Sequence, residues 1–100
     1  MTIMKAVFIA FDQAHYEKIL DILEKRNCRG FTSWETVQGR GTSTGEPHLG
    51  SHAWPSMASA IITMVEDDRV APLLDSLRSL DEAKPMLGLR AWVLPVEQSI

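Results

Sequence analysis

Two histidines four positions apart, His48 and His52, are the residues of this sequence best suited to bind a metal ion. Neutral imidazole is the commonest transition-metal ligand in proteins, and Glu46 adds a carboxylate nearby. Two imidazoles leave a tetrahedral zinc ion short of ligands, so Glu46, a water molecule or histidines of a neighbouring subunit would have to complete the site. The alternative is that both histidines are ordinary polar residues of a loop.

Glycines on both sides of Arg40 form a second candidate, for binding an anion. Gly39 and Gly41 come just after a predicted strand, so backbone amides and the Arg40 guanidinium could meet a phosphate or a carboxylate. The alternative is that the two glycines only serve a turn, because glycine adopts backbone conformations that other residues avoid.

Signals for catalysis are weak. The phosphate-binding motif G-x-x-x-x-G-K-[ST] is absent, and we expect no serine nucleophile held by a shaped turn. Cys28 follows a predicted helix instead of opening one, which favours a buried structural thiol. His15 is expected on the solvent side of that helix as an ordinary polar residue. We therefore predict that the protein is not an enzyme.

The three tryptophans differ in their predicted surroundings. Trp34 and Trp92 lie on predicted strands, where packing or an interface between chains is the simplest interpretation. Trp54, next to Pro55, could instead anchor a loop or contact a partner.

The strands that would position these residues follow from runs of β-branched, aromatic and small apolar residues. The predicted strands are residues 3–11, 31–38, 56–65 and 87–96, the last ending at or before Pro95. The first and third are apolar on both faces, which indicates central strands. The second mixes polar residues with β-formers, as an edge strand does.

Two amphipathic helices are predicted between these strands. Asp12 offers an N-cap oxygen to the first helix, which should end near residues 27–30. Its apolar stripe consists of Tyr16, Ile19, Leu20 and Leu23. The second helix follows the acidic residues 66–68 and has Pro72 in its first turn. Its apolar stripe consists of Val70, Leu73, Leu74, Leu77 and Leu80.

The order of these elements predicts a fold class. Two helices can cover only one face of a sheet of four strands, and the order strand, helix, strand, strand, helix, strand fits the α+β ferredoxin-like βαββαβ arrangement. We expect a single domain over residues 1–100, with an antiparallel sheet and both helices on one face. The other face, with Ile or Val from the first strand and Ala or Ile from the third, needs a cover. A further copy of the chain is the simplest one.

Composition excludes several classes of function. The 100 residues carry a formal net charge of -3, which lacks the basic footprint of a nucleic-acid-binding protein. One cysteine cannot close an intrachain disulfide, which favours a reducing cytoplasm. The apolar run near the N-terminus is well short of the roughly 20 residues that span a bilayer, so we expect no direct membrane insertion.

A long connection separates the second and third predicted strands. Residues 39–55 hold four glycines and two prolines in 17 residues. Connections longer than about 12–15 residues without secondary structure are uncommon in compact domains and are usually functional or disordered. We expect this loop to have a function.

The stretches GFTSWETVQGRG, SAIITMVEDDRVAPLLDSL and RAWVLPV resemble the PII signal-transduction proteins and their PII-like relatives, over nearly the whole chain. The resemblance implies a homotrimer in which a T-loop between the second and third strands contacts partner proteins. Gly39 and Gly41 look like the glycines at the base of that loop. Gly88 and Arg90 stand where nitrogen-regulatory members carry a second loop that holds nucleotide phosphates.

By the same resemblance, a small ligand binds at the clefts between subunits and changes which protein the loop contacts. With Arg40, the implied ligand-binding residues are Gly39, Gly41, Gly88 and Arg90. The implied partner-contacting residues are Gly45, Glu46, His48, His52 and Trp54. The ligand would be an adenine nucleotide or a divalent transition metal, and the partner a membrane transporter, an enzyme or a regulator.

Two hypotheses therefore stand beside each other. The first is a cytoplasmic homotrimeric regulator, related to nitrogen regulation, that senses a small ligand. The second is a metal-binding module for Zn, Cu or Ni that uses Glu46, His48 and His52, linked to metal efflux. A small oligomeric enzyme on the same fold is a third alternative, which an exposed reactive Cys28 would favour.

Overall fold

The computed structural model describes residues 3–28, 30–37, 39–40, 47–48 and 57–100 of the chain. Its strands are β1 (Met4–Asp12), β2 (Phe31–Val37), β3 (Gly39–Arg40), β4 (Pro47–His48), β5 (Ala58–Glu66) and β6 (Leu89–Pro95). Its helices are α1 (Tyr16–Lys25) and α2 (Val70–Ala83). Its short 3-10 turns are η1 (Gln13–His15), η2 (Asp67–Arg69) and η3 (Pro85–Leu87). Among the described residues, no helix is both long and apolar enough to cross a membrane.

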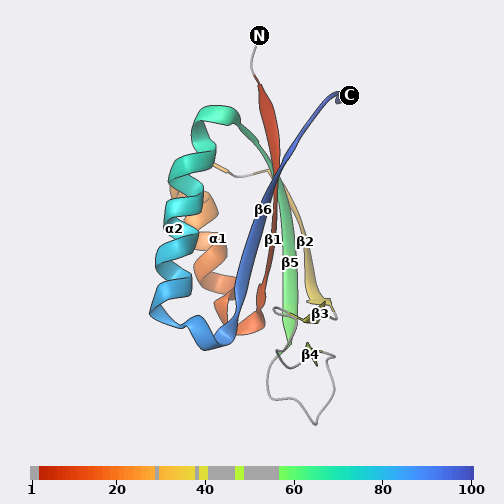
Figure 1. Cartoon of the computed structure of the whole chain (residues 1–100). Coiled ribbons are helices and arrows are strands. Elements are labelled where there is room, and N and C mark those ends of the chain that lie inside the picture. Colours follow the sequence, from red (N-terminus) through yellow and green to blue (C-terminus); the bar gives the residue numbers. More distant parts are fainter. Residues whose placement is uncertain (1–2, 29, 38, 41–46, 49–56) are drawn as a thin grey trace.

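The main sheet has the strand order β2-β5-β1-β6, and each neighbouring pair is antiparallel. Both α-helices cover the same face of this sheet (Figure 1). The α+β ferredoxin-like fold predicted from the sequence is thereby confirmed. The two strands that are apolar on both faces, β1 and β5, take the centre, and the more polar β2 lies at an edge.

The first helix starts through a local side-chain contact. Asp12 Oδ1 accepts a hydrogen bond from the Ala14 N–H at 2.8 Å, which confirms Asp12 as the capping residue. The capped turn is the 3-10 turn η1, and the α-helix itself begins at Tyr16.

The same helix ends earlier than residues 27–30, where the sequence placed its end. Asn27 adopts a left-handed φ of 58°. The N–H of Cys28 donates to the Leu23 carbonyl at 2.7 Å, and the N–H of Asn27 donates to Glu24 at 3.2 Å. This pairing is the Schellman pattern, which satisfies the carbonyls of Leu23 and Glu24 and ends α1 at Lys25.

The second helix tolerates its proline as predicted. Pro72 is the third residue of α2, within the first turn, where no intrahelical partner is available for a backbone N–H. The apolar stripe of α2 continues past it, and Leu73 and Leu77 are fully buried.

The hydrophobic core lies between the two helices and the sheet. Alternate residues of the central strands point toward the helices and interlock with both helical stripes. The largest fully buried apolar side chains are Ile9, Ile19, Leu23, Ile61, Leu73 and Leu77. Each side chain of this size stabilises the fold by about 1.5–3 kcal/mol when buried.

The face of the sheet without helices is also apolar. Strand pairing sets Phe8 opposite Ile62 on one side and Trp92 on the other, so the three side chains share this face. The rings of Phe8 and Trp92 lie 6.0 Å apart between centroids. Trp92 and three further side chains of this face are between 45% and 52% exposed; the three are Trp34, Met64 and Leu94. We call this surface the helix-free face.

The prediction that β1 contributes Ile or Val to the helix-free face is wrong. Val7 and Ile9 are fully buried under the helices, in one row with Phe11. Because side chains alternate along a strand, the helix-free face receives Phe8 and Ala10 instead.

For β5 the corresponding prediction is confirmed. Ala60 and Ile62 pair with Ala10 and Phe8 and therefore lie on the helix-free face, whereas Ile61 is buried in the core.

The long connection contains a short ribbon. β3 pairs with β4 in an antiparallel manner, with Gly39 opposite His48 and Arg40 opposite Pro47. The sequence suggested a connection without secondary structure over residues 39–55, but the structure shows this short ribbon within it. The rest of the loop lies outside the described residues.

The connection between α2 and β6 depends on one glycine. Gly88 has φ 77° and ψ 116°, a conformation that side chains disfavour. A Cβ at Gly88 would meet no atom within 4 Å, so the constraint comes from the backbone and not from crowding.

We therefore predict that Gly88→Ala destabilises the protein by about 1–3 kcal/mol, the usual cost of an unfavourable backbone conformation. Gly30→Ala is the matched control, because Gly30 also has open space around it and no positive φ. Urea unfolding of both variants measures the difference. Equal losses of stability in the two variants would contradict this account of Gly88.

Candidate functional site

The two stems of the long loop are joined at the turn that follows β1. The Gln13 N–H donates to the Met57 carbonyl at 2.6 Å, just before β5 begins. The Gln13 side chain reaches the Glu35 carbonyl of β2 at 3.3 Å, and the Ser59 hydroxyl donates to the same oxygen. One turn therefore holds the chain on both sides of the loop.

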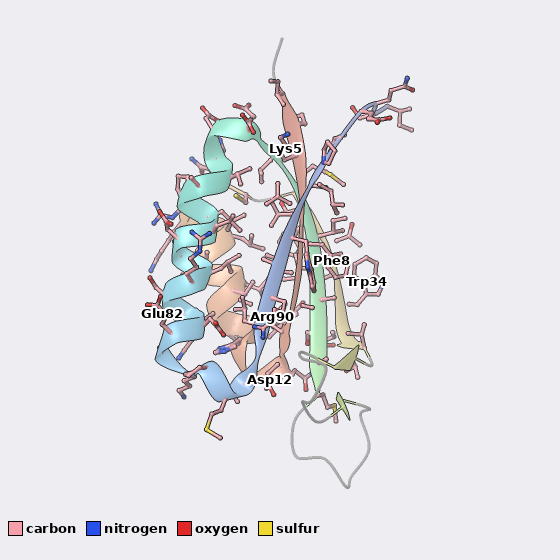
Figure 2. The ribbon with its side chains drawn as sticks, viewed as in Figure 1. Lys5, Phe8, Asp12, Trp34, Glu82 and Arg90 are labelled. Carbon is pink, nitrogen blue, oxygen red and sulfur yellow. The ribbon has the colours of Figure 1, made fainter. Side chains whose placement is uncertain are left out.

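The same turn also holds the connection before β6. The Asp12 N–H donates to the Gly88 carbonyl at 3.3 Å. Asp12 lies at the same end of the sheet as Arg90 and the short ribbon (Figure 2). We call the set of bonded residues Asp12, Gln13, Glu35, Met57, Ser59 and Gly88 the loop-base junction. It brings Gly88, a predicted ligand residue, next to the stems of the predicted partner loop.

His15 is the last residue of this turn, and it is buried. The prediction that it faces solvent is wrong, because its side chain is only 1% exposed. η1 places His15 one turn before Ile19 and two turns before Leu23, both buried, so it lies on the buried stripe of the helix.

Burial lowers the pKa of His15 below its ordinary value of 6.5. The carboxylates of Asp12 and Asp81 oppose this shift, and the nearby Lys18 and Lys84 ammonium groups add to it. His15 is therefore neutral in the folded protein near neutral pH.

The predicted loop residues fall into two groups. Gly39 and Arg40 form β3, and His48 belongs to β4, where its backbone pairs with Gly39. The remaining predicted ligand, partner and metal positions lie outside the described residues: Gly41, Gly45, Glu46, His52 and Trp54. Within the part of the chain that the structure describes, no three His, Cys, Asp or Glu side chains are grouped as a metal site.

Residues 41–45 spell GTSTG, which has the letters of the G-x-S-x-G hydrolase motif. That motif places its serine between a strand and a helix. Residues 41–45 instead lie between β3 and β4, outside the described residues. The context that the motif needs is therefore missing from the chain order.

Arg90 lies near the start of β6, with its side chain exposed. Its Nη1 donates to the Leu89 carbonyl at 2.9 Å. It lines a shallow hollow of about 160 Å³ between α2 and β6, together with Arg78 and Asp81. A guanidinium held in this way has further N–H groups that could bind an anion.

Cys28 is a buried thiol, as the sequence predicted. It is 3% exposed, and burial raises its pKa in spite of the nearby Arg69 and Arg26. A thiol with a raised pKa is a poor nucleophile, so its position gives no support to thiol catalysis.

The turn after β1 is the part of the site that sequence reasoning missed. Asp12 was recognised as a cap, but the bonds of Gln13 and Ser59 end on backbone carbonyls. Such bonds leave no pattern of residue types. For His15 a signal does exist, since it precedes the apolar stripe at helical spacing.

Comparison with solved structures identifies close relatives in fold. CPII from Thiomonas intermedia K12, a nitrogen regulatory PII-like protein bound to ADP, AMP and bicarbonate, superposes with a TM-score of 0.78 at 25% identity. The match covers 94% of this chain and 86% of CPII. No curated protein matches the chain significantly.

Two further structures share the fold at lower identity. A DUF3240 family protein from Shewanella baltica OS155 has a TM-score of 0.72 and 18% identity, over 100% of this chain and 97% of the other. A putative PII-like signaling protein from Thermus thermophilus has a TM-score of 0.68 and 19% identity, over 94% and 87%.

A family model settles the relationship at the level of sequence. The model of nitrogen regulatory protein P-II matches residues 4–100, which includes all the described strands and helices. The fold, the long connection between β2 and β5 and this match agree, and the chain belongs to the nitrogen regulatory protein P-II family.

Proposed function

We propose that this chain is a small-ligand sensor that controls a partner protein through residues 39–55. The observation that carries the proposal is the loop-base junction. It links Gly88 to both stems of the loop through hydrogen bonds of Asp12 and Gln13. A ligand that binds beside Gly88 can therefore favour one arrangement of the loop over another.

The proposed ligand is an anion, with an adenine nucleotide or bicarbonate as the first candidates. CPII, which is 25% identical, has been solved with ADP, AMP and bicarbonate. In this chain the group that we expect to meet phosphate or carboxylate is the Arg90 guanidinium, with the loop glycines Gly39 and Gly41 and with Arg40 at the other side of the cleft.

The proposed assembly is a homotrimer in which three single-domain chains cover their helix-free faces. Those faces expose large apolar side chains in an isolated chain, among them Trp34, Met64 and Trp92. Exposed apolar surface of this kind marks an interaction site. The clefts between the chains would then hold the ligand.

P-II proteins are in general signalling proteins and not enzymes, and we propose the same for this chain. The proposed location is the cytoplasm. The proposed partner is another protein, with a membrane transporter, an enzyme or a regulator as candidates. Residues Gly45, Glu46, His48, His52 and Trp54 are the proposed contacts.

Metal binding is the second candidate. The ribbon pairs the backbone of His48 with that of Gly39, so this histidine lies at the base of the loop. A metal held by Glu46, His48 and His52 would therefore act on the same loop.

Of the predictions that follow from the proposed function, the first concerns the assembly. Light scattering of the purified protein should give the mass of three chains of 11.2 kDa each. Met64→Glu should yield single chains, because a carboxylate cannot be desolvated in an apolar interface without a partner. Ser79→Glu on the exposed side of α2 is the matched control and should leave the mass unchanged. A wild-type mass of one chain would refute the trimer.

The second prediction concerns the ligand. Saturating ADP, AMP or bicarbonate should raise the melting temperature by several degrees, since a ligand at about 100 times its Kd stabilises by about 2.7 kcal/mol. Arg90→Gln should abolish most of that rise. Lys25→Gln, which removes a charge at the far end of α1, should retain it. If no anion changes the melting temperature, the sensor hypothesis loses its ligand class.

The third prediction concerns the metal. Calorimetric titration with Zn, Cu and Ni should detect binding that the His48→Ala, His52→Ala double variant lacks. Glu46→Gln should weaken it less, because a carboxamide oxygen can still coordinate. Metal binding that survives the double variant would exclude these histidines as ligands, and no binding at all would remove the second candidate.

A further inference from the structure

A buried ionisable side chain lies directly under the loop-base junction. His15 is 1% exposed, and its Nε2 has no hydrogen-bond partner among the described residues. A buried polar atom without a partner costs free energy, so its presence calls for an explanation. An apolar residue, like those of the neighbouring stripe of α1, could fill the position of His15 without this cost.

The backbone on either side of this imidazole carries the junction. Asp12 and Gln13 precede His15 by three and two residues, and their N–H groups bond to Gly88 and Met57. η1 is a single 3-10 turn, so a displacement of the His15 backbone would also displace these donors. His15 is thus linked to the loop stems through a very short piece of chain.

Charged groups from three elements act on the imidazole electrostatically. Asp12 comes from β1, Lys18 from α1, and Asp81 and Lys84 from the C-terminal end of α2. The carboxylates attract an imidazolium and the ammonium groups repel it, while burial disfavours the charge. The net effect lowers the pKa of His15, so the neutral form fits this site and the protonated form does not.

The stability of the folded junction depends on pH through His15. Neutral His15 stabilises the folded junction in full above the ordinary pKa of 6.5, and this contribution is lost as the pH falls toward the lower pKa of the folded protein. Burial and the Lys18 and Lys84 ammonium groups disfavour an imidazolium here, so protonation favours an arrangement that exposes the ring or brings a carboxylate closer to it.

We propose that the loop base is a proton-sensitive switch, in which protonation of His15 displaces the turn after β1 and releases the hydrogen bonds that hold the loop stems and Gly88. The proton is thus a second input to the same loop. The inference goes beyond the proposed function, because it concerns the junction itself and holds whichever ligand or partner the loop serves.

The test is an NMR titration of the full-length, 15N-labelled protein from about pH 8 to about pH 5, without ligand. The ring nitrogens of His15 and the backbone amides of Asp12 and Gln13 are followed together. We expect the three to shift with one common midpoint below 6.5. The amide of Val96, which bonds to Met4 at the opposite end of the sheet, should not follow that midpoint.

Two variants separate His15 from the other titrating groups. His15→Gln should remove the shift of the Asp12 and Gln13 amides, and the double variant His48→Gln, His52→Gln should keep it. Should His15→Gln fail to fold, the common midpoint in the wild-type protein still decides.

Three results would overturn the proposal. The first is a His15 ring that stays neutral down to about pH 5. The second is a ring that titrates while the amides of Asp12 and Gln13 stay in place. The third is an unchanged amide titration in His15→Gln, which would assign the shift to another group. A failure of anion binding would leave each of these readouts intact.

Discussion

Two helices cannot cover both faces of a sheet of four strands, and the other features of this molecule depend on that limit. The helices bury one row of side chains from each central strand, and these rows form the core. The second row, which includes Phe8 and Ile62, is just as apolar, but no layer above it is formed by the described residues. The central strands are therefore apolar on both faces. One face packs against the helices to form the core, and the other fits the contact between chains that we propose.

Strand order decides which segments of the chain lie together at the base of the loop. In an antiparallel sheet of this order, β1 and β2 end where β5 and β6 begin, so four chain segments meet at one end of the sheet. The turn after β1 is central among them, and its N–H groups reach both the loop stem before β5 and the connection before β6. Strand order brings together segments that lie far apart in the sequence.

Much of the fold was predictable because it depends on periodic patterns. The continuous apolar run of β1, the stripe of α2 and the tolerance of Pro72 in a first turn all have a direct physical reading. The choice of face for Val7 and Ile9 was not predictable in the same way, since β1 is apolar at both sets of positions and alternation alone does not say which row faces the helices.

The prediction for His15 is wrong because its polarity favours the surface, whereas its spacing from Ile19 and Leu23 places it on the buried stripe. The junction could not be predicted, because its acceptors are the carbonyls of Glu35, Met57 and Gly88, which any residue supplies.

The energies involved explain how such a site can switch while the fold persists. A typical hydrogen bond contributes about 0.5–1.5 kcal/mol net, so the few bonds of the junction hold the loop stems by a small amount. A pKa difference of one unit corresponds to about 1.4 kcal/mol, and a ligand at 100 times its Kd to about 2.7 kcal/mol. The free energies of protonation and of ligand binding are therefore comparable with the free energy of the hydrogen bonds in the junction. Each large core side chain, by contrast, contributes about as much as one of these inputs on its own, and the core contains many of them. In the mechanism that we propose, a proton or an anion therefore rearranges the end of the sheet where the loop begins, while the packing of β1 and β5 against the helices stays in place.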